Sequence, residues 1–127
     1  MAVIGIVGTR RRDSRQDFLQ CEKSFLEIYK DGDEIVSGGC PKGADAFAER
    51  LADKYSIEIV LFLAEWSKYG RAAGFIRNGD IASLADYLIA CVADDRTGGT
   101  EDTIKKFLKK LQISEGAAIE RGLLILI

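Results

Sequence analysis

The sequence predicts an α/β protein with a Rossmann-like, three-layer fold, in which a mainly parallel sheet of about five strands carries helices on both faces. The first observation is that short apolar runs alternate along the chain with segments of helical period, as in parallel β–α–β units. The second is that glycine-rich or charged turns follow these apolar runs. The third is that the 127 residues include one proline, no repeat and no Gly/Ser-rich linker, so residues 1–127 are expected to form a single domain.

The first half of the chain contains two strand–helix pairs. Ala2–Val7 is a continuous apolar run that predicts a buried strand, and Ile35–Ser37 predicts the next strand. Between them, a helix that ends at Asp31-Gly32 is predicted by apolar residues at helical spacing, namely Phe18, Cys21, Phe25 and Ile28. A second helix follows, and its apolar face consists of Ala44, Phe47, Ala48, Leu51, Ala52 and Tyr55.

The second half continues the alternation. A helix is predicted from Gly74 to Leu84, and Thr100 is expected to cap another whose inner face is formed by Ile104, Phe107, Leu108 and Leu111. The segment Ser114–Gly122 fits either a loop or a short helical turn. Three further strands are predicted at Ile57–Leu63, Tyr87–Val92 and Leu123–Ile127.

Composition narrows the function classes. A net charge of −2 argues against a protein that coats nucleic acid without sequence preference. No apolar run is long enough to cross a membrane, and Arg10-Arg11-Arg12 follow the first strand where a signal peptide would need a cleavage site. We therefore expect a cytoplasmic protein with no membrane partner. With three cysteines and no histidine, histidine-containing zinc sites and histidine bases are excluded, and we expect no resident metal.

Four loops are expected to meet at one edge of the sheet. The carboxyl ends of parallel strands lie together, and ligands of open α/β sheets bind just outside them. The loops that follow the first four predicted strands are rich in glycine or charge, and they span Gly8–Arg12, Ser37–Asp45, Glu65–Asn78 and Asp94–Thr100. Their convergence predicts a ligand site at this edge.

Two glycine-rich turns at this edge suggest phosphate binding. Gly38 and Gly43 have the glycine spacing of a Walker A loop, but Ala44 and Asp45 follow where lysine and a hydroxyl residue are required, so nucleoside triphosphate hydrolysis by that mechanism is not expected. The first strand also lacks the G-x-G-x-x-G pattern of dinucleotide sites. The turn is then interpreted as a site for a phosphate-sized anion between the strand and the helix. The alternative is a tight turn whose glycines serve packing only. The second turn, Gly98-Gly99-Thr100, has the same two interpretations, anion cradle or plain N-cap.

Arg77 and Asn78 are expected to face inward. On a helix they share a face with Ile81, Leu84 and Ala85, which should pack on the sheet. A charge placed there needs a partner. The candidates are a ligand phosphate or carboxylate, or an internal salt bridge to Asp45 or Asp94. Arg11 and Arg12 are expected to be solvated.

Taken together, the chain resembles a known group of small Rossmann-like proteins, the SLOG superfamily, and within it the YspA-related branch. The resemblance runs from Met1 to about Leu111 and rests on four motifs in order: Val7-Gly8-Thr9-Arg10, Ser37-Gly38-Gly39-x-x-x-Gly43-Ala44-Asp45, Trp66-x-x-Tyr69-Gly70-Arg71-Ala72-Ala73-Gly74-x-x-Arg77-Asn78 and Gly99-Thr100-x-Asp102-Thr103. The superfamily includes LOG-type phosphoribohydrolases and DNA-processing protein A. The resemblance implies a nucleotide-like ligand and the pocket residues Gly38, Gly39, Gly43, Asp45, Arg77, Asn78, Gly99 and Thr100.

One departure from this group bears on the reaction. LOG-type hydrolases carry a glutamate three residues after the threonine of their glycine turn, and here that position is Thr103. We therefore expect a binding or sensor domain for a nucleotide or nucleotide-derived phosphorylated ligand. The candidate binding residues are Gly8, Thr9, Arg10, Gly38, Gly39, Lys42, Gly43, Asp45, Trp66, Tyr69, Arg71, Arg77, Asn78, Gly98, Gly99 and Thr100.

Two alternatives stay open. A hydrolase that cleaves the N-glycosidic bond of nucleoside monophosphates would need a carboxylate beside the ribose, and Asp45, Asp94 and Glu101 are the candidates. Binding of single-stranded DNA fits least, because there is one tryptophan and no basic stripe beyond Arg10–Arg12 and Lys105–Lys110. No cofactor is required, although Asp94-Asp95 could hold Mg²⁺ beside a ligand phosphate. The apolar C-terminal run must be buried in the sheet or against a partner, and we expect a homo-oligomer.

Overall fold

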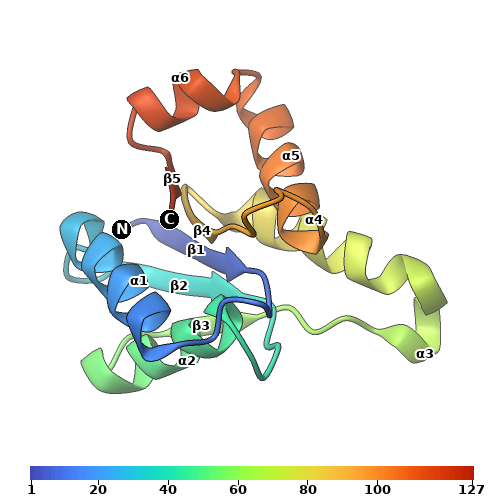
Figure 1. Ribbon diagram of the computed structural model, residues 1–127, viewed down its shortest axis with the longest axis horizontal. Coiled ribbons are helices and arrows are strands. Elements are labelled where there is room, and N and C mark those ends of the chain that lie inside the picture. Colours follow the sequence, from blue (N-terminus) through green and yellow to red (C-terminus); the bar gives the residue numbers. More distant parts are fainter.

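The computed structural model describes residues 1–127 and confirms the predicted α/β architecture (Figure 1). Five strands form one sheet in the order β3-β2-β1-β4-β5, and every neighbouring pair is parallel. The order reverses between β1 and β4, and in open parallel sheets such a reversal opens a crevice at the carboxyl ends of the strands. The elements are β1 (Val3–Gly8), α1 (Arg15–Ile28), β2 (Glu34–Ser37), α2 (Ala44–Tyr55), β3 (Ile59–Leu61), α3 (Trp66–Tyr69), a 3₁₀ turn (Gly70–Ala72), α4 (Ala73–Leu84), β4 (Tyr87–Cys91), α5 (Gly99–Leu111), α6 (Glu115–Glu120) and β5 (Leu124–Leu126).

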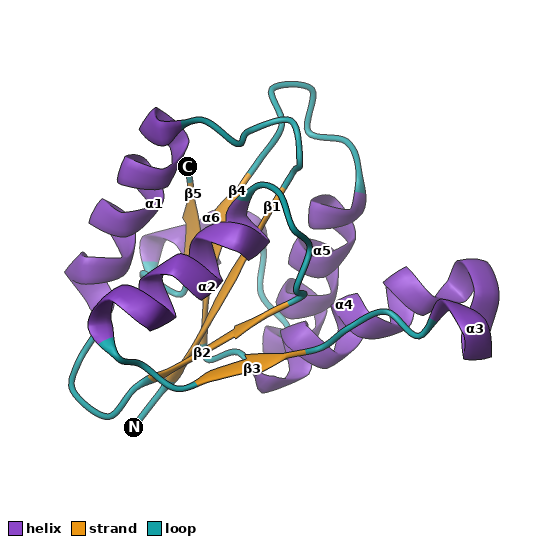
Figure 2. Cartoon of the chain, turned by 90° about the horizontal axis from the view of Figure 1, so that it is seen from below, coloured by secondary structure: helices purple, strands orange, loops and turns teal.

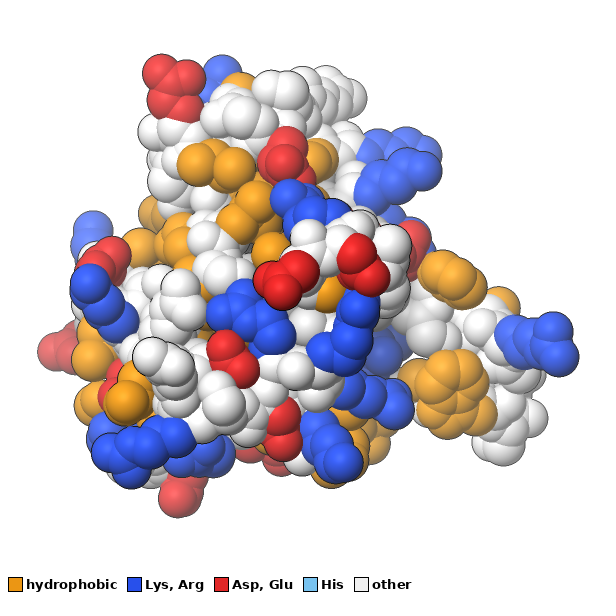
Figure 3. Space-filling model, in the orientation of Figure 1, with side chains coloured by type: hydrophobic (Ala, Val, Ile, Leu, Met, Phe, Trp, Pro, Cys, Tyr) orange, Lys and Arg blue, Asp and Glu red, His pale blue; other side chains and the backbone are white.

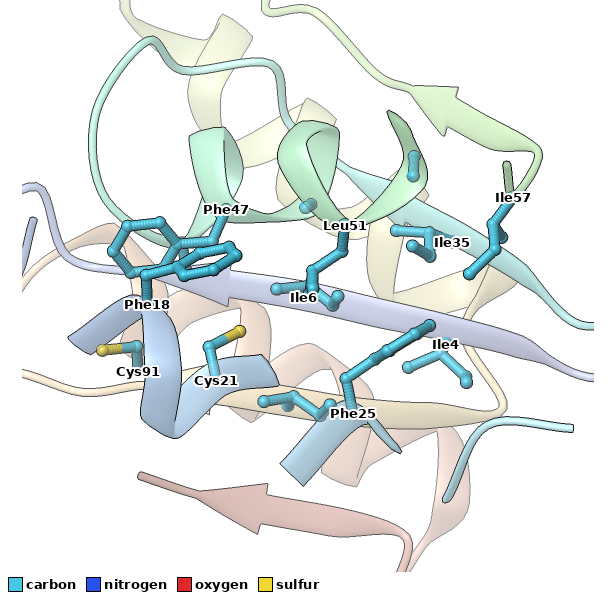
Figure 4. Packing of buried hydrophobic residues seen from close by; sticks show 14 residues of the cluster. Ile4, Ile6, Phe18, Cys21, Phe25, Ile35, Phe47, Leu51, Ile57 and Cys91 are labelled. Atoms are coloured by element: carbon cyan, nitrogen blue, oxygen red, sulfur yellow. The ribbon is translucent and has the colours of Figure 1, made fainter. Parts of the chain in front are cut away.

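One face of the sheet packs against α1 and α2. Alternate strand residues such as Ile4, Ile6 and Ile89 point to this side, because successive side chains of a strand face opposite ways. They meet Phe25 from α1 and Phe47 from α2 in a cluster of fully buried side chains (Figure 4). The helical spacing seen in the sequence therefore corresponds to the buried faces of these two helices.

The other face packs against α4 and α5. Val7, Leu88 and Ala90 point to this side, where they meet Ile81 of α4 and Phe107 of α5. Figure 2 shows the sheet between the two pairs of helices, which is the predicted three-layer arrangement. No helix of the protein has both the length and the apolar character that crossing a membrane requires.

The apolar C-terminal run is buried in the sheet as its last strand. β5 pairs with β4, and Leu124 is fully buried among the side chains that face α4 and α5. Before it, the segment 114–122 contains α6, whose first turn is capped by Ser114: its side chain accepts the N–H of Ala117 at 3.1 Å. The short helical turn is therefore the correct one of the two interpretations.

Three element boundaries differ from the sequence-based expectation. The strand predicted at Ile57–Leu63 is shorter, because Ser56 ends α2 in the left-handed conformation and the N–H of Ile57 bonds back to Ala52 of that helix. Thr100 does not cap α5: the helix begins at Gly99, and Gly98 precedes it with a φ of 109°. The segment 66–72, expected as loop, forms α3 and the 3₁₀ turn.

The start of α1 offers a test of local stability. The Ser14 side chain accepts the N–H of Asp17 at 3.0 Å, and the Asp17 carboxylate accepts the N–H of Ser14 at 3.2 Å, which is a capping box. We expect Ser14→Ala to lower the free energy of unfolding by about 1 kcal/mol, measured by urea titration. Ser14→Asp, which can still accept the helix N–H, is the control and should lose much less. Equal losses in the two variants would show that the cap contributes nothing.

Candidate functional site

A pocket lies at the reversal of strand order, where β1 and β4 end. Its volume is about 390 Å³, within the range of small-molecule sites. Its walls come from the loop after β1, the turn after β2, the first half of α4 and the start of α5. The lining residues are Val7, Gly8, Thr9, Arg10, Arg11, Cys40, Asp45, Arg77, Asn78, Ile81, Thr97, Gly98, Gly99, Thr100 and Thr103.

The first turn of α5 presents unpaired N–H groups to this pocket. The backbone N–H groups of Gly98, Gly99 and Thr100 find no acceptor in the protein, as expected at a helix N-terminus without a side-chain cap. Thr100 is 8% exposed, and its hydroxyl has no hydrogen-bond partner although it lines the pocket. These donors, together with the positive end of the helix dipole, are suited to an anion.

The turn before α2 is built differently. Its Gly43 N–H donates to the Asp13 carboxylate at 2.7 Å, and its Cys40 N–H donates to Asp45 at 3.1 Å. Gly43 has a φ of 74°, and a Cβ there would lie 2.6 Å from the carbonyl oxygen of Thr9. A carboxylate of the protein itself thus sits at the start of α2, and this glycine turn packs closely on the loop after β1. Of the two glycine turns, the one before α5 has no carboxylate of the protein bonded to the N–H groups of Gly98, Gly99 or Thr100.

Arg77 and Asn78 lie on the inward face of α4 with Ile81, as their spacing predicted, whereas Leu84, which was expected to pack on the sheet with them, is exposed. Arg77 Nη1 donates to the carbonyl oxygen of Gly38 at 2.9 Å, and its Nε donates to Asn78 Oδ1 at 3.1 Å. Asn78 in turn donates to the Gly99 carbonyl at 3.3 Å and to Asp102 at 3.1 Å. Asn78 therefore connects α4 to the start of α5 by hydrogen bonds. Arg77 lines the pocket and forms no salt bridge with Asp45 or Asp94, which was the alternative expectation.

The three arginines after β1 have different environments. Arg10 lines the pocket, is exposed and makes no hydrogen bond within the protein. Arg11 forms a two-pronged pair with Asp95 at 3.0 Å for both contacts, and this hydrogen bonding holds the pKa of the Asp95 carboxyl well below its ordinary value. Arg12 is largely buried, pairs with Asp17 at 3.1 Å and donates to the carbonyls of Val92 and Ile127. Arg11 is exposed, as expected, although it pairs with Asp95. The expectation that Arg12 is solvated is wrong, because its ion pair with Asp17 and its hydrogen bonds hold it mostly out of the solvent.

Of the three carboxylates considered as catalytic groups, only Asp45 lines the pocket. Asp94 is exposed and borders a separate hollow beside Arg11 and Arg12. Glu101 forms a two-pronged pair with Arg96, at 2.8 and 2.9 Å. No three Cys, Asp or Glu side chains lie close enough together to hold a metal ion.

Several residues predicted for the site lie outside the pocket. The segment that carries α3 projects from the body as an arm, so Trp66, Tyr69 and Arg71 are exposed on it (Figures 1 and 3). Lys42 is exposed on the far side of the turn before α2. Gly38, Gly39 and Gly43 lie beneath the lining rather than in it: a Cβ on Gly38 would lie 2.6 Å from Arg77 Nη1, and one on Gly39 would lie 2.4 Å from a Leu63 methyl. The predicted residues that the fold brings together are Gly8, Thr9, Arg10, Asp45, Arg77, Asn78, Gly98, Gly99 and Thr100.

The pocket also contains residues that were not predicted as site residues. Thr97 and Arg11 belong to loops already assigned to this edge, so the loop pattern alone could have included them. Thr103 and Ile81 follow from helical spacing, because they lie one turn after Gly99 and Arg77 respectively. Val7 and Cys40 could not be recognised as site residues from the sequence. An apolar residue at a strand end is also expected in a core without a site, and a small residue is also expected in any tight turn.

Comparisons with known proteins place the fold. No protein-family model matches the chain, and no curated protein matches its sequence. Among solved structures it is similar to the molybdenum cofactor binding protein from the phototrophic bacterium Rippkaea orientalis, with a TM-score of 0.70 and 18% sequence identity. The match covers 98% of this chain and 88% of that chain, so the likeness extends over the whole fold.

Proposed function

We propose that this protein binds a small phosphorylated ligand, a nucleotide or a nucleotide-derived compound, with its phosphate on the first turn of α5. The observation that carries the proposal is the set of free N–H groups of Gly98, Gly99 and Thr100 in a pocket of about 390 Å³ at the sheet edge. Three backbone donors that converge at a helix N-terminus match the oxygens and charge of a phosphate.

The surrounding charges support the same ligand class. Arg10 makes no ion pair, and Arg77 uses only Nε and Nη1 on neutral acceptors, so both retain donors for an anion. Figure 3 shows Lys and Arg side chains on one face of the molecule, with Asp and Glu side chains among them. The structural neighbour is described as a molybdenum cofactor binding protein. That likeness supports the binding of a small ligand by this fold.

We propose binding rather than hydrolysis of the ligand. A glycosidic hydrolase of the expected type needs a free carboxylate near the sugar. Glu101 is paired with Arg96, Asp94 lies outside the pocket, and Thr103 stands where the hydrolase glutamate would be. Asp45 lines the pocket, but its carboxyl group is buried and bonded to Ser37 and to the Cys40 N–H. Because Asp95 is paired with Arg11, any Mg²⁺ would have to enter with the ligand phosphate.

The test is to identify small molecules released when the purified protein is denatured. We expect mass spectrometry to detect a compound with a phosphate group at a substantial fraction of the protein concentration. Finding only compounds without phosphate would contradict the proposal. Incubation with nucleoside monophosphates should release no free base. Release that disappears in Asp45→Asn, Asp94→Asn or Glu101→Gln would favour the hydrolase alternative.

A further inference from the structure

The carboxyl group of Asp45 contacts the hydroxyl group of Ser37, which also contacts a backbone carbonyl. The hydroxyl oxygen of Ser37 lies 2.5 Å from the carbonyl oxygen of Ile6 and 3.1 Å from Asp45 Oδ1. A serine hydroxyl carries one hydrogen, and a carbonyl oxygen can only accept. The hydroxyl donates that hydrogen mainly to Ile6, which is the shorter contact, so the longer contact to Asp45 is a weak hydrogen bond. Ser37 therefore gives an ionised Asp45 little stabilisation.

The position of Arg77 agrees with an uncharged Asp45. The two side chains flank Gly38 closely, because a Cβ on Gly38 would lie 2.6 Å from Arg77 Nη1 and 2.8 Å from Asp45 Oδ2. A guanidinium next to an ionised carboxylate is expected to form charge-assisted hydrogen bonds with it. Instead Arg77 donates to the Gly38 carbonyl and to Asn78, both neutral.

The surroundings of Asp45 also favour the neutral form. Burial of the side chain, which is 8% exposed, raises the pKa of Asp45, against the lowering effects of the Cys40 N–H, Arg77, Ser37 and Arg10. The charged groups that face it are Arg77 from α4 and Arg10 from the loop after β1, and Cys40 is the titratable neighbour in its own turn. On β1, the Ile6 carbonyl accepts the Ser37 hydroxyl that also contacts Asp45.

We propose that Asp45 acts as a proton-linked control of the ligand site: it is a carboxylic acid in the receptive state, and ionising it draws Arg77 away from the ligand anion. This inference rests on the proposed function, because it concerns the same pocket. An ionised Asp45 would both compete for Arg77 and repel a bound anion. Binding of an anion is therefore coupled to uptake of a proton by Asp45.

The coupling has a definite sign. Anion binding stabilises the protonated carboxyl, so affinity is highest at low pH and falls as pH rises through the pKa of Asp45. Above that pKa, each pH unit weakens anion binding by up to about tenfold. The stability of the empty protein follows the same direction, since the folded-state pKa is raised: the contribution of protonated Asp45 is complete below the unfolded-state pKa and is lost as pH rises through the folded-state value.

The experiment follows the Asp45 side-chain carboxyl by ¹³C NMR from about pH 4 to about pH 8, with and without inorganic sulfate. Sulfate is the probe because its charge does not change over this range, whereas phosphate would add its own titration. We expect sulfate to move the Asp45 midpoint upward by at least about half a pH unit. Sulfate affinity should become nearly independent of pH in Asp45→Asn and keep its dependence in Asp53→Asn, an exposed aspartate of the same helix.

The two proposals fail in different ways. If sulfate shifts the amide resonances of Gly98, Gly99 and Thr100 but leaves the Asp45 midpoint unchanged, the proton linkage is overturned and the anion site stands. If sulfate leaves those amides unchanged, the anion site is overturned, and the linkage with it. The carboxyl titration is made on the unsubstituted protein, so it does not depend on whether Asp45→Asn folds.

Discussion

Gly99→Asp is expected to abolish ligand binding while leaving the fold as stable as before or slightly more stable. Gly99 is the first residue of α5, and a Cβ there would have only Asn78 Nδ2 nearby, at 3.8 Å. A carboxylate at this position would sit where we place the ligand phosphate. Close like charges cost several kcal/mol, so we expect affinity to fall by about 100-fold or more. The same carboxylate favours the helix dipole by about 0.3–1 kcal/mol.

This combination separates a binding site from a structural turn. The thermal midpoint and the amount of ligand that remains bound after purification are measured for Gly99→Asp and for two controls. Gly99→Ala adds a methyl group in a space that admits it, and Gly99→Asn adds the same volume without charge, so both should retain more ligand than the aspartate variant. Full ligand content in Gly99→Asp would rule out the first turn of α5 as the phosphate site.

Phe107→Ala is expected to have the largest effect on stability. Phe107 is fully buried in the cluster that joins α5 to α4 and the sheet, beside Ile81, Leu88 and Ile104. Removing a buried phenyl ring costs about 3–5 kcal/mol through lost burial and the cavity that remains. A domain of this size has a total stability of about 5–15 kcal/mol, so the variant should lose a large fraction of it.

The consequence extends to the site, because Phe107 anchors the helix whose first turn lines the pocket. Urea unfolding should show the large loss for Phe107→Ala and a loss of about 1 kcal/mol for Phe107→Leu, which keeps most of the apolar volume. If Phe107→Ala lost less than about 1 kcal/mol, α5 would not depend on this contact, and the described packing of α5 would be contradicted.

The layers of the fold could be predicted because each element carries its own pattern. Continuous apolar runs such as Ala2–Val7 indicate strands buried on both faces, and the spacing of Phe18, Cys21 and Phe25 indicates one buried helix face. The strand at Ile57–Leu63 was predicted too long because periodicity does not reveal where a helix ends. The left-handed Ser56 and the bond from Ile57 to Ala52 decide that boundary.

The parts of the site that depend on loop position could be predicted from the sequence. The parts that depend on which side chains contact one another could not. Loops at the carboxyl edge brought Arg10, Arg77 and Gly99 to one pocket. The sequence could not show that Asp13 occupies the N–H of Gly43, since the two are 30 residues apart. Nor could it show that Trp66 lies on a projecting arm, because a loop aromatic fits a pocket wall equally well. The homo-oligomer expected from the sequence remains a prediction.

The central claim is that the first turn of α5 binds the phosphate, and its most direct test is a titration of the ¹⁵N-labelled protein with inorganic phosphate, followed by NMR. We expect the amide signals of Gly98, Gly99 and Thr100 to move together and saturate, while those of the first turn of α2 move little because the Asp13 carboxylate already sits at its start. Saturating shifts at the start of α2 with none at Gly98–Thr100 would contradict it.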